Sequence, residues 1–146
     1  MAMKRIHEVW LRWCLFVVVG LSLTACEPEI THIELCGLNY TSNHIGFFVN
    51  GAAGADITPH AGGGGFVCCV GLPKRWRKGL QVTVRWRDDE QHPDVWKEKI
   101  VEVPRYEPSD IGFFAVHFYP DDSIKVLVTT KMAGYPGYPY PRPPKE

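Results

Sequence analysis

The sequence has no excess of either charge and no apolar run long enough to cross a membrane. Its 16 lysine and arginine residues equal its 16 aspartate and glutamate residues, whereas a nucleic-acid-binding domain normally carries a strongly basic face. The apolar run at residues 13–23 is shorter than the roughly 20 residues that a membrane-spanning helix needs. These features argue against a nucleic-acid partner and against a transmembrane helix.

The sequence also lacks the short motifs of common enzymes and metal sites. It contains no Gly-x-Ser-x-Gly elbow and no Cys-x-x-Cys or His-x-x-x-His spacing. The glycine run at residues 62–65 is followed by a strand-like segment, whereas a phosphate-binding loop is followed by a helix. We therefore expect no catalytic residues, no metal and no cofactor.

The N-terminus carries the features of a secretion signal. Three basic residues precede the apolar run at residues 13–23, which ends in Leu23-Thr24-Ala25-Cys26, so an n-region is followed by an h-region. The small-residue ending resembles the bacterial lipoprotein signal, in which Cys26 is acylated and becomes the new N-terminus. An ordinary cleaved signal or a short signal anchor is the alternative.

Removal of residues 1–25 defines the mature chain. It takes away three of the 16 basic and one of the 16 acidic residues, so 13 and 15 remain with a net charge of −2, and 146 − 25 leaves 121 residues. This length suits one small domain. We expect an acylated cysteine and short spacer at residues 26–31, a β domain at 32–133, and a Pro/Tyr-rich tail at 134–146 that is extended and lies outside the core.

Short segments of apolar residues predict a mainly β domain. Apolar and polar residues alternate most clearly at residues 80–87, and Asn50-Gly51 is a strong turn signal. The other predicted strands are residues 32–40, 45–49, 66–70, 96–103, 113–119 and 124–130. We therefore predict a small antiparallel β-sandwich or barrel-like domain of about six or seven strands.

Three of the five cysteines fall in the mature domain. Export places Cys36, Cys68 and Cys69 in an oxidising compartment, where disulfides persist. Their odd number predicts one bridge, from Cys36 to either Cys68 or Cys69, and one buried free thiol. A catalytic cysteine with His60 or His117 as its base is the alternative, but no local signature supports it.

A long glycine-rich stretch is the first candidate for partner binding. It runs from Gly51, in the Asn50-Gly51 turn, to Gly65 and includes Gly63 and Gly64. Loops with few side chains are common binding elements. The alternatives are a flexible loop or a place where another backbone approaches closely.

A basic segment with a tryptophan is the second candidate. Lys74, Arg75, Trp76 and Arg77 are adjacent, and Trp and Arg are the residue types that dominate interface energetics. We expect this patch to face an acidic partner or anionic lipid headgroups. The alternative is a solvated turn whose long basic side chains snorkel.

Several short motifs, in order, resemble those of a known family. They are Asn39-Tyr40-Thr41, Phe48-Val49-Asn50-Gly51, the glycine run at 62–65, Cys68-Cys69-Val70, Leu72-Pro73-x-x-Trp76, Val82-x-Val84-x-Trp86 and Val116-His117-Phe118-Tyr119-Pro120. Together they resemble the domain-of-unknown-function family 3304, small lipoproteins of Gram-negative bacteria. The resemblance covers most of the mature domain.

This resemblance implies a function beside type VI secretion phospholipase effectors. Family members look like immunity proteins, so we expect a periplasm-facing lipoprotein that binds and inhibits a cognate phospholipase toxin without catalysis of its own. The residue after Cys26 is Glu27 and not Asp, which resembles the sorting pattern of outer-membrane lipoproteins. A structural or assembly lipoprotein of the envelope or of the secretion apparatus is the alternative.

Overall fold

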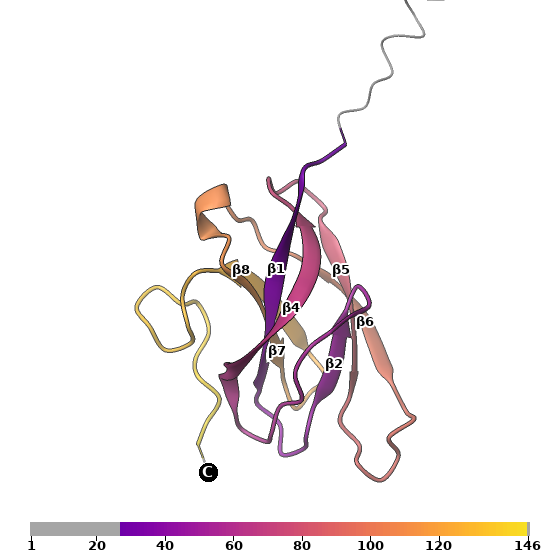
Figure 1. The fold of residues 1–146 in the computed structure, drawn as a ribbon. Coiled ribbons are helices and arrows are strands. Elements are labelled where there is room, and N and C mark those ends of the chain that lie inside the picture. Colours follow the sequence, from indigo (N-terminus) through magenta and orange to yellow (C-terminus); the bar gives the residue numbers. More distant parts are fainter. Residues whose placement is uncertain (1–26, 146) are drawn as a thin grey trace, which may run out of the picture.

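The chain forms a β-sandwich of two four-stranded sheets (Figure 1). The computed structural model describes residues 27–145, so the expected signal and acylation site at Cys26 lie outside the described residues. One sheet has the order β4-β1-β7-β8 and the other β3-β2-β5-β6. The strands are β1 (Ile30–Asn39), β2 (Gly46–Val49), β3 (Ala52–Ala53), β4 (Gly62–Pro73), β5 (Gln81–Arg87), β6 (Lys97–Glu102), β7 (Phe113–Phe118) and β8 (Ile124–Thr129), with a 3-10 turn η2 (Pro108–Asp110) before β7. Among these residues, no helix is long and apolar enough to cross a membrane.

The predicted sandwich is confirmed, with one difference in strand direction. All neighbouring strands pair antiparallel except β1 and β7, which are parallel. The sequence predicted antiparallel pairing because consecutive strands tend to form hairpins. The central strand β1 instead takes both of its neighbours, β4 and β7, from distant parts of the chain, so no tight turn fixes their direction.

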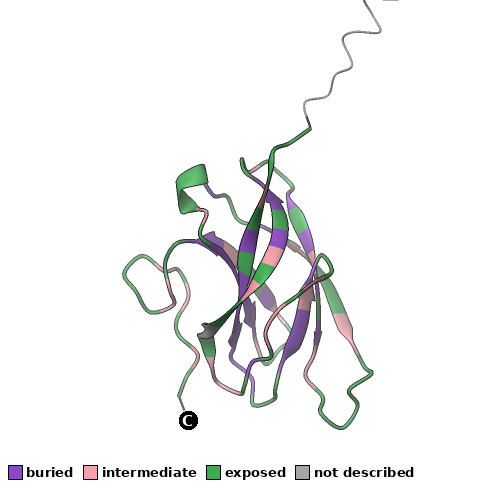
Figure 2. Ribbon diagram, in the orientation of Figure 1, coloured by how far each residue is buried: buried purple, intermediate pink, exposed green. Residues whose placement is uncertain are grey.

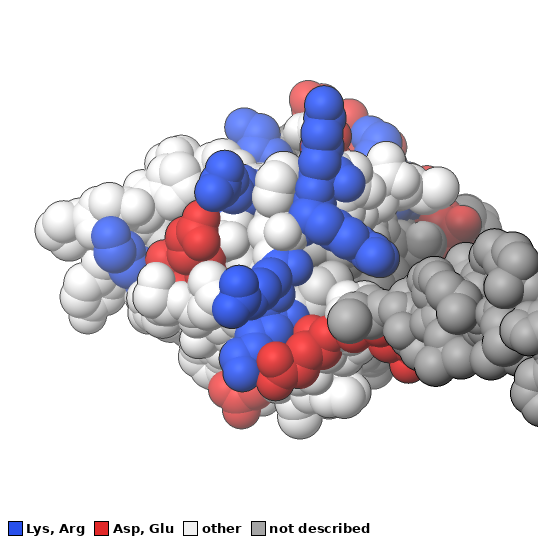
Figure 3. All heavy atoms as spheres, turned by 90° about the horizontal axis from the view of Figure 1, so that it is seen from above, with Lys and Arg blue, Asp and Glu red and all other residues white. Residues whose placement is uncertain are grey.

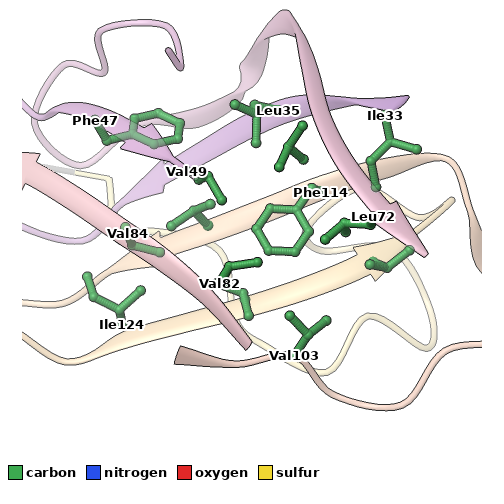
Figure 4. Close-up of a cluster of buried hydrophobic side chains, with 14 of the residues drawn as sticks. Ile33, Leu35, Phe47, Val49, Leu72, Val82, Val84, Val103, Phe114 and Ile124 are labelled. Atoms are coloured by element: carbon green, nitrogen blue, oxygen red, sulfur yellow. The ribbon is translucent and has the colours of Figure 1, made fainter. Parts of the chain in front are cut away.

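The main core lies between the two sheets, where the buried residues concentrate (Figure 2). The period-two pattern of β5 turns Val82, Val84 and Trp86 inward, and each is at most 4% exposed. Val82 and Val84 face side chains of the other sheet such as Leu35 and Phe114 (Figure 4). Burial of each large apolar side chain contributes roughly 1.5–3 kcal/mol, so this layer holds the sheets together.

The C-terminal tail covers part of the outer face of the β4-β1-β7-β8 sheet, over β7. Tyr138 and Tyr140 pack on His117 of β7, and the hydroxyl of Tyr40 donates to the carbonyl oxygen of Pro141 over 2.5 Å. All six residues of β7 are therefore buried. The sequence of a strand that is buried on both faces is a continuous apolar run and does not alternate between apolar and polar residues.

Residues 134–145 belong to neither core cluster, but the expectation that the tail is extended is wrong where it turns at residues 132–138. Backbone hydrogen bonds from Tyr135 to Met132 and from Tyr138 to Tyr135 close two turns. Gly134 and Gly137 have φ angles of 86° and 83° there, a conformation that glycine adopts readily. The prolines alone suggested an extended segment, but the intervening glycines fold it back onto the sheet.

Candidate partner-binding surface

The cysteines pair differently from the prediction. Cys68 and Cys69 are joined to each other, so neither sulfur is a thiolate nucleophile in this state. The register of β4 on β1 shifts here and places both residues opposite Glu34, as in a β-bulge. Cys36 lies opposite Phe66 and is buried under the tail. The predicted bridge to Cys36 is therefore wrong, because the strand register separates it from both candidate partners.

The Asn50-Gly51 turn lies where the sequence predicts it, between β2 and β3. The φ angles of these residues are 48° and 84°, which suits the two-residue turns that match the twist of a hairpin. Both residues are exposed. The side-chain oxygen of Asn50 accepts a hydrogen bond of 2.8 Å from the backbone N–H of Thr83, so the turn is fixed to β5.

Gly63 and Gly64 belong to β4, not to a loop. The neighbouring Gly62 shows why glycine is needed here, because an added Cβ would lie 2.6 Å from the Cα of Leu38. The start of β4 therefore lies close against the backbone of β1. The glycine run permits this approach. The expectation of a loop is therefore wrong for residues 62–65, which form the start of β4.

Trp76 is part of the fold and not an exposed anchor. Its side chain is half-buried against the main core, and its Nε1–H donates to the carbonyl oxygen of Val103 over 2.9 Å. Lys74 pairs with Glu29, with 3.0 Å between Nζ and Oε1. The tryptophan in this segment thus holds the turn in place, while Arg75 and Arg77 on either side are exposed.

The two predicted candidates lie at opposite ends of β4. Gly63 and Gly64 are near its start, and Lys74 follows its end directly. A strand of 12 residues is about 36 Å long. The structure therefore does not combine these residues into one surface.

A third surface, which the sequence analysis missed, lies on the outer side of the β3-β2-β5-β6 sheet. We call it the open face and define it by Phe48, Arg85, Arg87, Trp96 and Ile100. Cross-strand pairing brings Phe48 opposite Arg85, and it brings Ile100 opposite Thr83. Ile100 is 65% exposed. This sheet thus presents apolar and cationic groups to solvent, whereas the tail covers the part of the other outer face that lies over β7.

Trp96 is the centre of the open face. The guanidinium carbons of Arg85 and Arg87 each lie 5.4 Å from the centre of its ring, and the ring of Phe48 lies at 5.3 Å. These distances allow cation–π attraction between the indole and both guanidinium groups, and a planar guanidinium can in addition bind a carboxylate through its N–H edge. Arg85 shares part of its charge with Glu98, with a nitrogen–oxygen distance of 3.6 Å.

A cleft of about 280 Å³ borders the open face at Arg87. Its lining residues are His44, Gly46, Asp56, Arg87, Asp89, Glu90 and Pro93. It therefore combines both signs of charge beside the aromatic centre. Within residues 27–145, no group of three or more His, Cys, Asp or Glu side chains is arranged to hold a metal ion.

His117 has a perturbed pKa, but its contacts are those of a residue that stabilises the fold. It is completely buried, and burial lowers its pKa from 6.5 to about 4. Its Nδ1–H donates to the carbonyl oxygen of Lys125 over 3.1 Å, and Nε2 lies 2.7 Å from the hydroxyl of Tyr138. The neutral ring thus links β7, β8 and the tail.

The fold is that of a small β-sandwich domain whose tail covers one outer surface over β7 and leaves the open face bare. Residues 38–126 match the family model described as "Protein of unknown function (DUF3304)". This match covers more than half of the chain, so the chain belongs to that family. No curated protein and no solved structure is significantly similar to it.

Proposed function

We propose that the mature chain is a lipid-anchored immunity protein that faces the periplasm and inhibits a cognate type VI secretion phospholipase. The observation that carries this proposal is the open face, where the guanidinium groups of Arg85 and Arg87 both lie over the ring of Trp96. Trp and Arg in a shared cluster are the usual centre of a high-affinity protein interface. The exposed side chain of Ile100 extends its apolar area.

The family resemblance and the N-terminal sequence support the rest of the proposal. The resemblance implies a place beside secreted phospholipase effectors, and Cys26 ends a lipoprotein-like signal. An anchored inhibitor is concentrated at the membrane, where a phospholipase must act. Inhibition then requires only that the bound domain block access of the toxin to lipid.

We propose steric occlusion as the mechanism. A specific interface buries roughly 800 Å² on each partner, an area on the scale of one face of a small sheet. Trp96 and Ile100 fill the apolar centre of this interface. Arg87 binds a carboxylate of the toxin at its rim, because guanidinium groups form bidentate hydrogen bonds with carboxylates. Arg85 can do the same by exchanging Glu98 for a carboxylate of the toxin.

The test begins with a search of the neighbouring genes for a phospholipase, recognised by a Gly-x-Ser-x-Gly motif, and then asks whether this protein inhibits it. The purified protein should form a complex with it and stop phospholipid hydrolysis, and co-expression in the periplasm should restore growth. Trp96→Ala should weaken the complex by about 30-fold or more, as expected for a residue worth at least 2 kcal/mol.

Tyr135→Ala is the matched control, because Tyr135 is a 60% exposed aromatic residue of the tail and lies outside the open face. It should leave inhibition unchanged, and both variants should keep the thermal stability of the parent. If the unaltered protein neither binds the toxin nor restores growth, the proposal is wrong. A structural lipoprotein of the envelope would then be the better explanation.

A further inference from the structure

The described chain begins close to its expected anchor. Cys26 is separated from the first residue of β1, Ile30, by residues 27–29 alone. Four residue steps at about 3.6 Å each span at most about 14 Å. An acyl group on Cys26, which belongs to the proposed function, therefore holds this end of the sandwich against the lipid headgroups.

A cationic turn occupies this same end. We call residues 74–78 the basic loop, and four of its five residues are Lys or Arg. The loop contacts the tether directly, because the backbone N–H of Lys74 donates to the carbonyl oxygen of Glu29 over 2.7 Å. Figure 3 views the molecule from this end and shows Lys and Arg side chains gathered on it.

The fold holds the basic loop in one conformation. Trp76 is hydrogen-bonded to Val103, and the hydroxyl of Tyr106 donates to the carbonyl oxygen of Pro73 over 2.5 Å. These inward contacts leave the basic side chains of the loop outside. The loop is therefore a prearranged cationic surface.

The charge of the loop is only partly compensated. Glu29 neutralises Lys74, and nearby Arg105 pairs with Glu107 at 3.0 Å. Arg75, Arg77 and Lys78 are exposed, and no carboxylate of residues 27–145 forms an ion pair with them. Glu27 of the tether is the one further acidic residue between the anchor and β1.

We propose that the basic loop binds anionic phospholipid headgroups and orients the anchored domain on the membrane. Each Lys or Arg near an anionic surface contributes about 1 kcal/mol, so three of them favour the docked orientation by roughly a hundredfold. β1 then runs away from the bilayer, and the open face stands side-on to it. A membrane-bound partner approaches the open face laterally.

The test uses the full acylated protein on vesicles of phosphatidylcholine, with and without phosphatidylglycerol. An amine-reactive reagent reports the exposure of Lys78 in the loop and of Lys145 at the C-terminus, which lies at the other end of the molecule (Figure 1). Phosphatidylglycerol should slow the reaction of Lys78 by about tenfold or more and leave Lys145 unchanged. High salt should remove the difference, because it screens exposed charges.

Arg75→Glu with Arg77→Glu is the matched variant, since it keeps both Lys78 and Trp76. It should abolish the effect of phosphatidylglycerol on Lys78. The proposal would be overturned if Lys78 and Lys145 were slowed equally, or if Lys78 were slowed as much on vesicles of phosphatidylcholine alone. A mature chain without an acyl group would also overturn it. The double variant should still inhibit the toxin in solution, so failure of this inference and failure of the proposed inhibition give different results.

Discussion

His117 should make the stability of this protein depend on pH below neutrality. The ring is completely buried, and its pKa is lowered from 6.5 to about 4 because burial disfavours the charged form. Its Nδ1–H is directed at the carbonyl oxygen of Lys125. In this tautomer Nε2 accepts the hydrogen bond from the hydroxyl of Tyr138. When the ring becomes charged at low pH, Nε2 is therefore the nitrogen that must take up the added proton.

The direction of the effect follows from the two pKa values. The unfolded chain titrates near 6.5 and the folded chain near 4, so between these values the unfolded state binds more protons. The stabilisation is complete above pH 6.5 and is lost as the pH falls toward 4. A difference of 2.5 pKa units corresponds to about 3 kcal/mol in total, of which about 2 kcal/mol is lost by pH 5.

Urea denaturation at pH 7, 6 and 5 measures this loss. His117→Gln keeps a donor and an acceptor but does not titrate, so the variant should lose much less stability than the parent between pH 7 and 5. Asp89 and Asp121 also have lowered pKa values, through side-chain hydrogen bonds from His92 and Ser123. Their contribution is lost only as the pH falls below about 3.8. Equal losses in parent and variant would refute the reasoning.

Three other predictions test the local structure. Trp76→Phe removes the indole N–H, so the free energy of unfolding should fall by about 1 kcal/mol; an unchanged urea midpoint would show that this bond does not hold the basic loop. Gly62→Ala places a Cβ 2.6 Å from a backbone carbon of β1 and should cost about 1–3 kcal/mol in the same assay, while a neutral result would disprove the close approach. Peptide mapping of the non-reduced protein should find Cys68 linked to Cys69, and a cross-linked peptide that contains Cys36 would contradict the strand register.

The parts of the fold that could be predicted from sequence depend on neighbouring residues. Alternation at Val82, Val84 and Trp86 fixes which side of β5 is buried, because side chains of a strand alternate between its faces. Asn50-Gly51 specifies its turn, since both residues tolerate positive φ angles. These local features were sufficient to predict a β-sandwich.

The predictions that were wrong concern features that depend on which strands become neighbours. The cysteine pairing followed from a count, but the bulge opposite Glu34 decides it. The side chain of Trp76 looked exposed in a basic segment until the fold supplied the carbonyl of Val103. The sequence held one hint of the open face: Trp96 lies on the same period-two face of its segment as charged residues. That Trp96 lies over the arginines of β5 became apparent only from the pairing of β5 with β6.

The position of each surface relative to the tether restricts what the protein can bind. The tail covers the outer face over β7, and in the proposed anchored state the short tether would place the basic loop against the bilayer. The open face would then remain accessible and would face along the membrane and not into it. A toxin that diffuses on the bilayer would meet Trp96 and Arg85 without the domain having to turn over.

Lengthening the tether by a flexible insertion after Glu27 should therefore leave inhibition in detergent unchanged but weaken protection of cells, because the effective concentration of a tethered site falls as its linker lengthens. Growth rescue measured for a series of insertions would show this, and rescue that is independent of linker length would count against an oriented inhibitor.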